Sequence, residues 1–370
     1  MTVSAPLLAW YDRARRDLPW RRTADPYAIW VSEAMLQQTQ VATVIPYYHR
    51  FLQRFPTVQA LAAAPEGDVL KAWEGLGYYS RARNLQKAAR VVLADHGGRL
   101  PDTAAALKTL PGIGPYMAGA VASIAFGRSE PVLDGNVERV LTRLFAIADP
   151  VAGRATRQHL WALAAELLSP ARPGDHNQAM MELGATLCTP RAPACGACPL
   201  SARCRAAAAG NPEGFPCKTP RAATPHHHIA VGVVAHGGRL LLVRRPPKGL
   251  LGGMWEFPGG RVADGEAVAD GVARNLRERF GLTVAVATPL APVRHAFTHR
   301  RVTLHPFHCR AAADAVAPRF HVDHRWLAGD AVAGLALPRA HQKIAAQMAG
   351  QPSGPVTGQL FGQTLEAAGG

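Results

Sequence analysis

Apolar residues recur at helical spacing through most of the first half of the chain. Short stretches rich in Pro and Gly, such as LPDT, LPGIGP and DPVAG, separate these segments between residues 5 and 209, and no convincing strand pattern occurs among them. Residues 210–228 are Pro-rich, basic and without periodicity, which is typical of a linker. The linker ends in three histidines, His226–His228, which we expect to be solvated. The pattern therefore predicts an all-α domain over residues 1–209.

A different pattern begins at residue 229. The segments IAVGVVA and LLLVRR flank an HGGR turn and predict a hairpin, and RVTLHPFHC alternates like a further strand. Between these strands, the residues from Glu266 to Phe280 have helical spacing. We therefore expect an α+β domain over residues 229–350, followed by a tail over residues 351–370.

Charge narrows the choice of partner. The 370 residues, 48% of them hydrophobic, carry 41 Lys and Arg against 26 Asp and Glu, a formal net charge of +15. This excess favours a polyanion, with nucleic acid first. An anionic membrane is the alternative, but we find no long basic amphipathic helix, lipid signal or apolar segment of transmembrane length. We expect a soluble, cytoplasmic protein and a monomer.

Four of the six cysteines lie close together in the sequence. They are Cys188, Cys195, Cys198 and Cys204, in the spacing C-x6-C-x2-C-x5-C. Four thiolates at such spacing indicate one inorganic centre in a reducing compartment, and their chemistry suits either zinc or an iron–sulfur cluster. Cys217 and Cys309 fall outside the pattern and are interpreted as ordinary thiols.

Two carboxylic acids are candidates for acid–base chemistry. Glu33 stands among apolar residues in WVSEAMLQQTQV, where burial would raise its pKa and retain a proton, although a solvated helix glutamate is the ordinary alternative. Asp134 in VLDGNV could instead be only the N-cap of a helix. It follows two helical patterns, residues 104–127, joined by LPGIG. The backbone N–H groups near Gly112 and Gly114 suit a DNA phosphate, although LPGIG could be merely a helical turn.

Residues 260–282 resemble the Nudix pattern. The matches are Gly260, Glu266, Arg274, Leu276, Glu278, Gly281 and Leu282. Asn275 and Arg279 stand where a Nudix hydrolase has magnesium-binding glutamates, so two oxygen ligands are missing. Pyrophosphate hydrolysis is therefore not expected.

The glutamate segment, the hairpin with its aspartate, the cysteine loop and the degenerate Nudix domain occur in the order typical of the MutY adenine glycosylases. The chain resembles this family over about residues 5–350. The resemblance implies a helix-hairpin-helix glycosylase domain with a [4Fe-4S] cluster in the loop at residues 188–204, and a Nudix-like domain that recognises 8-oxoguanine. It implies a monofunctional DNA glycosylase of base excision repair, which hydrolyses the N-glycosidic bond of adenine opposite 8-oxoguanine or guanine in double-stranded DNA.

The resemblance also implies roles for individual residues. Glu33 would protonate adenine N7 and act on the water, and an ionised Asp134 would stabilise the cationic sugar. Tyr116 and Asn136 would support Asp134. The bifunctional relatives that resemble endonuclease III have a lysine at position 116, whose amine forms a Schiff base, so a strong lyase activity is not expected.

Further residues are assigned by the same resemblance. The adenine pocket would be lined by Trp20, Leu36 and Gln178, with Arg21 bonding the base or a phosphate, although Trp20 and Leu36 could equally be core residues. Gln38 and Tyr78 would wedge into the DNA stack when adenine is flipped out. In the HAFTH segment, Phe297, Thr298 and His299 would read 8-oxoguanine. Thr298 replaces the usual serine, so discrimination against guanine is expected to differ.

Three rival functions are kept open. A bifunctional pyrimidine glycosylase and lyase should have lysine at position 116 and no Nudix-like domain. A nucleotide pyrophosphohydrolase would need the missing glutamates, and a non-catalytic lesion-binding module would not depend on Glu33 or Asp134. The GQLFG segment at residues 358–362 faintly resembles a tail that binds a sliding clamp.

Overall fold

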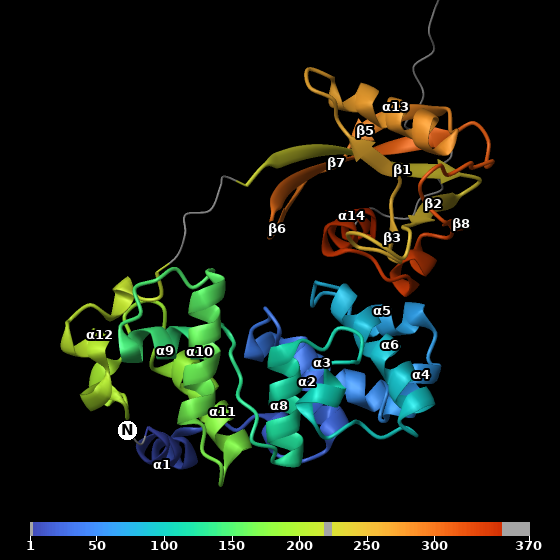
Figure 1. The fold of residues 1–370 in the computed structure, drawn as a ribbon. Helices are drawn as coiled ribbons and strands as arrows, with labels where there is room; N and C mark the ends of the chain where they lie inside the picture. The colour runs from blue at the N-terminus through green and yellow to red at the C-terminus, as the bar shows by residue number, and fades with distance from the viewer. Residues whose placement is uncertain (1–2, 218–223, 350–370) are drawn as a thin grey trace, which may run out of the picture. The chain divides into compact units, whose positions relative to one another are not determined.

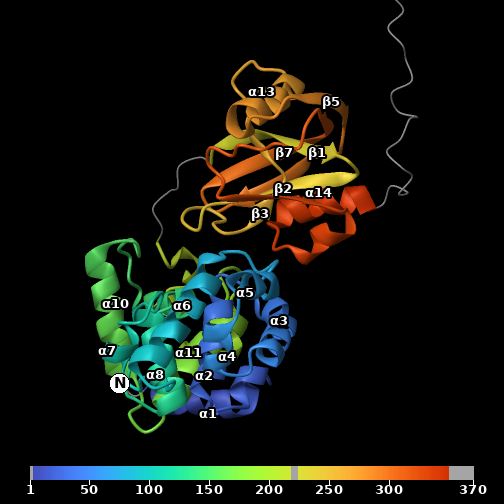
Figure 2. The same ribbon diagram turned by 90° about the vertical axis from the view of Figure 1, so that its right-hand side faces the viewer.

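The computed structural model describes residues 3–217 and 224–349. Contacts divide the chain into two compact units. The first, called here the helical unit, contains the described residues of Met1–Pro65 and Arg81–Ala222. The second, the sheet unit, contains those of Ala223–Gly370 together with Glu66–Ser80. Figures 1 and 2 draw each unit as a ribbon, with labels on many of its helices and strands.

The helical unit is built from helices joined by short turns, and its described residues contain no strand. Its helices are α1 Ser4–Ala14, α2 Pro26–Leu36, α3 Val41–Arg54, α4 Val58–Ala63, α6 Ser80–Asp95, α7 Ala104–Leu107, α8 Pro115–Phe126, α9 Gly135–Phe145, α10 Arg154–Leu167, α11 Pro173–Thr186 and α12 Arg205–Ala208. Short 3-10 turns are η1 Pro19–Arg21, η2 Cys195–Ala197, η3 Ser201–Arg203 and η4 Pro212–Gly214. This agrees with the predicted all-α domain.

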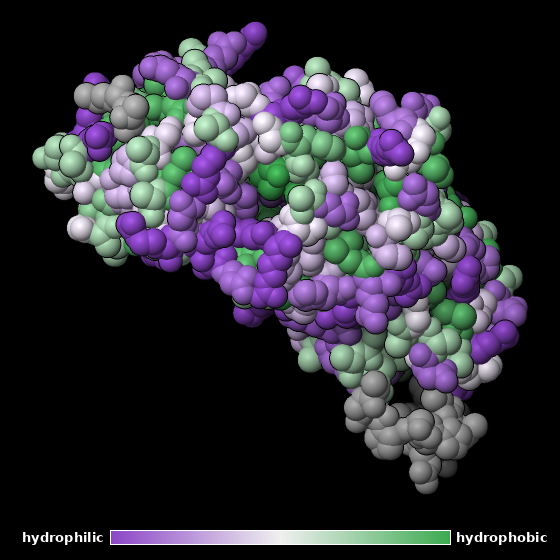
Figure 3. All heavy atoms as spheres, turned by 90° about the horizontal axis from the view of Figure 1, so that it is seen from below, coloured by the Kyte–Doolittle hydropathy of each residue, from purple (hydrophilic) through white to green (hydrophobic). Residues whose placement is uncertain are grey.

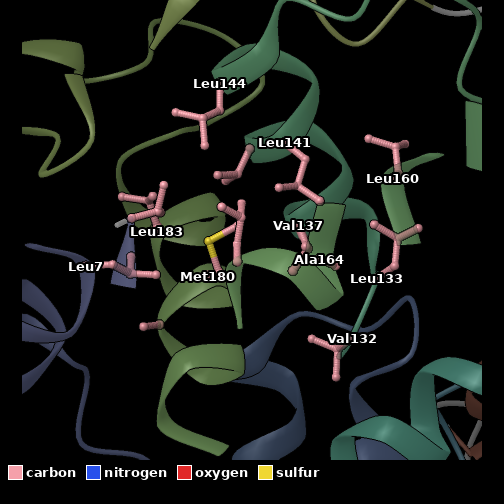
Figure 4. Packing of buried hydrophobic residues seen from close by; sticks show 14 of the residues in the cluster. Leu7, Val132, Leu133, Val137, Leu141, Leu144, Leu160, Ala164, Met180 and Leu183 are labelled. Atoms are coloured by element: carbon pink, nitrogen blue, oxygen red, sulfur yellow. The ribbon is translucent and has the colours of Figure 1, made fainter. Parts of the chain in front are cut away.

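Helices α9, α10 and α11 pack around an apolar core. Figure 4 shows Val137, Leu141 and Leu144 of α9 near Met180 and Leu183 of α11. The apolar residues of α9 recur on one side of the helix, because a spacing of three or four residues brings side chains onto the same face. This packing fixes the start of α9, and thereby Asp134, against α11.

The sheet unit contains one eight-stranded sheet. Its strands are β1 His226–His236, β2 Arg239–Arg244, β3 Trp255–Glu256, β4 Gly259–Arg261, β5 Val284–Pro289, β6 Val293–Phe297, β7 Arg300–Ala311 and β8 Asp323–Leu327. The main path runs β3-β2-β1-β7-β5, with β4 beside β1, β6 beside β7 and β8 beside β2. The pair β1 and β7 is parallel, and the other pairs are antiparallel. The unit also contains α5 Glu66–Ala72, α13 Val268–Phe280, η5 Asp330–Gly334 and α14 Arg339–Ala349.

A helix packs on each face of this sheet (Figure 1). On one face Val272, Leu276 and Phe280 of α13 meet Ala230 and Val234 of β1, among others. On the other face, Ala340 and Ile344 of α14 meet a second group of strand residues, which includes Val231, Val233, Val302 and Leu304. Alternation along each strand sends successive side chains to these two cores.

The helical unit ends later, and the sheet unit begins earlier, than the predicted linker at residues 210–228 implied. The chain contacts the helical unit as far as Cys217, whose carbonyl accepts from the Val151 amide at 3.2 Å. Strand β1 begins at His226, so the three histidines belong to the sheet and the expectation that they lie in the linker is wrong, although His226 and His228 are exposed to solvent as expected. A Pro-rich composition identifies the connection, but it cannot locate the first residue that pairs with a distant strand.

The surface drawn in Figure 3 is mainly hydrophilic or intermediate, with hydrophobic residues in small separate patches. Within the described ranges, no helix has the length and apolar character needed to cross a membrane.

Candidate active site and lesion-reading site

Glu33 is a carboxylic acid in an otherwise apolar helix. Helix α2 starts at Pro26, and the Asp25 side chain caps it by accepting from the Tyr27 amide at 3.0 Å. The residues of α2 from Tyr27 to Met35 are all buried, and Glu33 is only 4% exposed. The sequence therefore places a carboxyl group inside the helical unit rather than in solvent.

The surroundings of Glu33 favour its protonated form. The pKa of Glu33 is raised from 4.5 to about 7, with burial as the largest cause; the hydrogen bond from Tyr116 and the charge of Arg21 oppose the rise, and the nearby Asp134 adds to it. The Tyr116 hydroxyl donates to Glu33 Oε2 at 2.6 Å and also contacts Met181 Sδ at 3.3 Å. The phenol at position 116 therefore bonds the candidate acid directly, and its contact is not with Asp134.

Asp134 is held by hydrogen bonds at the start of α9. Its Oδ1 accepts from the backbone amides of Asn136 and Val137 at 3.0 and 2.8 Å, and its Oδ2 accepts from Asn136 Nδ2 at 2.9 Å. Burial raises the pKa of Asp134, whereas these hydrogen bonds and Arg139 lower it. The N-cap interpretation and a place in the pocket thus hold for one residue.

Arg139, which the sequence analysis did not single out, fixes Asn136. Its Nη2 donates to Asn136 Oδ1 at 2.8 Å and to the Gly184 carbonyl at 2.7 Å, and its Nε donates to the Cys188 carbonyl at 2.7 Å. A Cβ on Gly184 would lie 2.6 Å from Asn136 Cβ, so α9 and α11 approach here too closely for a larger residue. The guanidinium leaves the Asn136 amide nitrogen directed at Asp134.

A pocket of about 160 Å³ brings together all eight residues predicted for catalysis and adenine binding. They are Trp20, Arg21, Glu33, Leu36, Tyr116, Asp134, Asn136 and Gln178. The volume is comparable to the ~150 Å³ cavity that holds a benzene ring in another protein. Trp20 is buried and packs edge-to-face on Tyr48 with centroids 5.5 Å apart, so it belongs to the core and also lines the pocket.

Glu182 is a second buried carboxylate of this pocket. It is 1% exposed, and its Oε2 accepts from Arg16 Nη2 and Arg21 Nη2, both at 2.8 Å. Burial alone would raise the pKa of Glu182, but these two arginines lower it to about 2. Arg21, predicted to bond the base or a phosphate, is thus ion-paired within the protein. The sequence signal that could have identified Glu182 is its position as the only acid in QAMMELGA, four residues after Gln178.

The predicted DNA contacts of the helical unit lie on turns. Gly112 has a φ of +79°, and a Cβ there would lie 2.5 Å from Asn84 Cβ, so only glycine fits. Gly114 is the N-cap residue of α8. Gln38 is exposed, with a φ of +56°, just after the end of α2. Arg81 Nη1 donates to the carbonyls of Ala34, Met35 and Gln37 at 2.6–2.9 Å and so holds this end of α2.

In the sheet unit, the residues predicted to read 8-oxoguanine form the β6–β7 hairpin. Phe297 pairs with Arg300, so Thr298 and His299 are the two turn residues, and both are exposed. Phe297 packs edge-to-face on His295 with centroids 4.6 Å apart. The Thr298 hydroxyl lies 2.5 Å from the hydroxyl of Tyr78, a residue that is 46% exposed with a φ of +46°.

The two positions that lack Nudix glutamates are used for internal hydrogen bonds. Asn275 is buried and donates to the carbonyls of Arg261 and Gly271, and Arg279 donates to the Gly259 carbonyl at 2.9 Å. Glu266 is paired with Arg274 at 2.6 Å. These groups stabilise the sheet unit and supply no cluster of free carboxylates for magnesium.

The four clustered cysteines lie together in the loop after α11. All are free and partly exposed, and burial together with the other three cysteines raises the pKa of Cys198 to about 11. Among the described residues, no three His, Cys, Asp or Glu side chains are close enough to share one ion. A four-iron cluster offers a separate iron to each thiolate, so its ligands need not share one ion. Arg143 Nη1 donates to Cys188 Sγ at 3.3 Å, a charge that suits thiolate ligands.

Family comparisons agree with this arrangement. Residues 31–166 match the HhH-GPD superfamily of base excision DNA repair proteins, residues 188–204 the iron–sulfur binding domain of endonuclease III, and residues 230–347 the NUDIX domain. A thermostable thymine-DNA glycosylase of known structure is 32% identical, with a TM-score of 0.50, and the match covers 55% of this chain and 94% of that one. The fold and pocket thus define a helix-hairpin-helix DNA repair glycosylase with a Nudix-like domain.

Curated relatives define the family more closely. The human adenine DNA glycosylase is 39% identical over 96% of this chain and 76% of its own length. The enzyme of the same name from Mycolicibacterium smegmatis is 47% identical over 58% of this chain and 73% of its own. The chain therefore belongs to the adenine DNA glycosylase family. It is a monofunctional DNA N-glycosylase of base excision repair, and the cysteine loop is its [4Fe-4S] site.

Proposed function

We propose that this glycosylase removes adenine that is mispaired with 8-oxoguanine or guanine. The observation that carries the proposal is the pair of carboxyl groups in one pocket, with Glu33 protonated near neutral pH and Asp134 bound by three hydrogen bonds. The two different environments suit an acid and an ionised partner. Adenine leaves poorly as an anion, so a proton held inside the pocket meets the main requirement of the reaction.

In the proposed reaction, Glu33 gives its proton to adenine N7 as the bond between C1′ and N9 breaks and its electron pair goes to N9. The positive charge that develops on the sugar is stabilised by the Asp134 carboxylate, which Asn136 orients. Water then adds to C1′, and its proton passes to the Glu33 carboxylate. The products are neutral adenine and an abasic site, and Glu33 regains its acid form.

Tyr116 supports a hydrolytic rather than a Schiff-base reaction. Its phenol has no amine to attack the sugar, and its hydroxyl already donates to Glu33. We propose that this hydrogen bond orients the Glu33 carboxyl, with its proton on the oxygen that faces the base. Trp20, Leu36 and Gln178 would contact the flipped adenine from the walls of the same pocket.

We assign the reading of the opposite base to the β6–β7 turn. Thr298 has a hydroxyl that can bond the O8 and N7 edge of 8-oxoguanine, with Phe297 and His299 beside it in the sequence. Gln38 and Tyr78 would wedge into the base stack, and the amides near Gly112 and Gly114 would bind a phosphate. We propose that the protein acts as a monomer on chromosomal DNA in the cytoplasm. The GQLFG segment lies outside the described residues.

A single-turnover assay tests this function. The duplexes carry adenine opposite 8-oxoguanine, adenine opposite guanine, or thymine glycol opposite adenine, and strand breakage is scored before and after alkali. We expect adenine release from the first two duplexes, with breakage only after alkali. Breakage without alkali at thymine glycol, with adenine untouched, would contradict the proposal and indicate a bifunctional pyrimidine glycosylase.

A further inference from the structure

Three strands of the sheet unit place basic side chains on one face. In the parallel pairing of β1 with β7, His226 lies beside Arg301 and His228 beside Thr303, while Arg294 of β6 pairs with Thr303 from the other side. Residues paired across strands point to the same face, and residues two apart on a strand do so too. His305, two residues after Thr303, therefore also points to this face.

Hydrogen bonds and ring contacts tie the histidines together. His226 Nε2 lies 2.9 Å from Thr303 Oγ1, and His228 Nδ1 lies 2.9 Å from His305 Nε2. The His228 and His305 rings stack with centroids 5.2 Å apart, and His226 and His228 are 4.9 Å apart. The imidazoles of His226, His228 and His305 thus form one cluster on the sheet, here called the histidine cluster.

The opposite face of the same strands is buried. Val293, Val302 and Leu304 alternate with the basic residues and pack into the core beneath α14. On the histidine-cluster face, α13 begins to cover the strands only from Ala230 of β1 and Phe307 of β7 onward. The first residues of β1 and β7 on this face are therefore not covered by α13 and are open to solvent.

A pocket of about 560 Å³ lies over this open end. Its lining consists of His226, His228, Pro292, Arg294, His295, Ala296, Arg301, Val302, Thr303 and His305. None of these lining residues is an Asp or a Glu. Two guanidinium groups, of Arg294 and Arg301, and the three imidazoles of the histidine cluster share this face of the sheet, and no carboxylate among the lining residues neutralises them. This composition suits an anion with several acceptor oxygens.

The electrostatics of the cluster agree with an anion site. Burial and the nearby His228, Arg301 and Arg294 lower the pKa of His226, and burial with His228 and His226 lowers that of His305. The neighbouring imidazoles thus disfavour protonation of His226 and of His305, and Arg294 and Arg301 add to this effect at His226; a bound anion would relieve the repulsion.

We infer that the histidine cluster with Arg294 and Arg301 is a binding site for a phosphate group. A phosphodiester of double-stranded DNA is the source we favour, because the cluster shares β6 and β7 with the turn proposed to read 8-oxoguanine; this choice of source rests on the proposed function. The site would bind the backbone without reading sequence. A free phosphate or nucleotide offers the same chemistry and is the other source to be distinguished.

The test uses the full chain with its iron–sulfur cluster loaded, together with an undamaged fluorescent duplex. Affinity is measured by anisotropy over a range of salt concentrations for the wild type, Arg301→Gln and His228→Gln. Arg239→Gln is the matched control, because Arg239 is exposed and pairs with His236 at the far end of β1. Loss of one phosphate contact should reduce the slope of log affinity against log salt by about 1. We expect this for Arg301→Gln and a several-fold weaker affinity for both variants, with the control unchanged.

A second arm distinguishes the source. Histidine ring signals of the full chain, labelled with ¹³C and assigned by His→Gln variants, are followed by NMR while inorganic phosphate is added. Movement of the His226, His228 and His305 signals with no effect of the variants on duplex affinity would support the site and make a free phosphate its source. Unchanged duplex affinity together with unmoved ring signals would overturn the inference.

Failure of this inference can be told apart from failure of the proposed function. Adenine release by the wild type is measured in parallel on duplex with adenine opposite 8-oxoguanine. If the wild type releases no adenine while the variants still change the salt slope, the proposed function fails and the phosphate site stands. If adenine is released while neither binding arm responds, only the phosphate site is overturned.

Discussion

Replacing Glu33 with Gln is expected to stabilise the helical unit at alkaline pH. Glu33 is only 4% exposed, and its pKa is raised from 4.5 to about 7, mainly by burial. As the pH rises from 4.5 to about 7, the unfolded chain loses a proton that the folded chain retains. The free energy of unfolding therefore falls by about 1.4 kcal/mol per pH unit, about 3 kcal/mol over the whole window.

Glutamine does not ionise, so the free energy of unfolding of Glu33→Gln does not contain this pH-dependent decrease. The difference in stability between the variant and the wild type should be small and constant below pH 4.5 and should grow in favour of the variant up to about pH 7. For a domain of this size, 1 kcal/mol corresponds to about 2–4 °C in Tm. We expect a relative gain of roughly 6–12 °C at pH 8 compared with pH 4.5.

The assay is thermal unfolding of both proteins across this pH range, with the iron–sulfur cluster loaded. Glu166→Gln is the control, because Glu166 is an exposed glutamate on α10 and the same substitution there should give no pH-dependent difference. A Tm difference between Glu33→Gln and the wild type that stays constant across the range would refute the argument. It would mean that Glu33 ionises in the folded protein as easily as in the unfolded chain.

Other substitutions test the supports of the pocket. Glu182→Gln leaves Arg16 and Arg21 without their shared carboxylate and should cost about 3 kcal/mol in urea unfolding at pH 7. The cost should shrink as the pH falls from 4.5 to about 2, because the unfolded chain takes up a proton there that folded Glu182 does not; an equal cost at pH 7 and at about pH 2 would contradict the ion-pair assignment. Arg81→Met removes the nitrogen that donates to three carbonyls at the end of α2 and should cost about 1–2 kcal/mol in the same measurement; no loss would exclude this role. Cys198→Ser should lose the visible absorbance of the iron–sulfur cluster, and full retention would exclude it as a ligand.

The predicted site residues came from local signatures, and the fold was needed to bring them together. Glu33 and Asp134 lie on α2 and before α9, far apart in the chain, yet both line one pocket with Tyr116. The local pattern around each residue identified it, because the chemistry is concentrated in short motifs. The pattern also placed Asp134 correctly as a cap, since capping depends only on the next few amides.

Pairings between residues that are far apart in the chain could not be predicted from the sequence. Glu182 becomes part of the pocket through Arg16 and Arg21, and Arg139 through Asn136, and neither pairing leaves a local signature. The three histidines were misplaced for the same reason. A polar run beside Pro-rich sequence resembles a linker, and only its pairing with β7 makes it a strand.

The pH dependence of adenine release under single-turnover conditions tests the central claim most directly. The substrate is a duplex with adenine opposite 8-oxoguanine, at enzyme concentrations that keep it fully bound at every pH. Because the pKa of Glu33 is about 7, we expect the rate of adenine release to fall as the pH rises through about 7, and Glu33→Gln to release none. A rate that stays constant from acidic to alkaline pH, or adenine release by Glu33→Gln at the wild-type rate, would contradict the assignment of Glu33 as the acid.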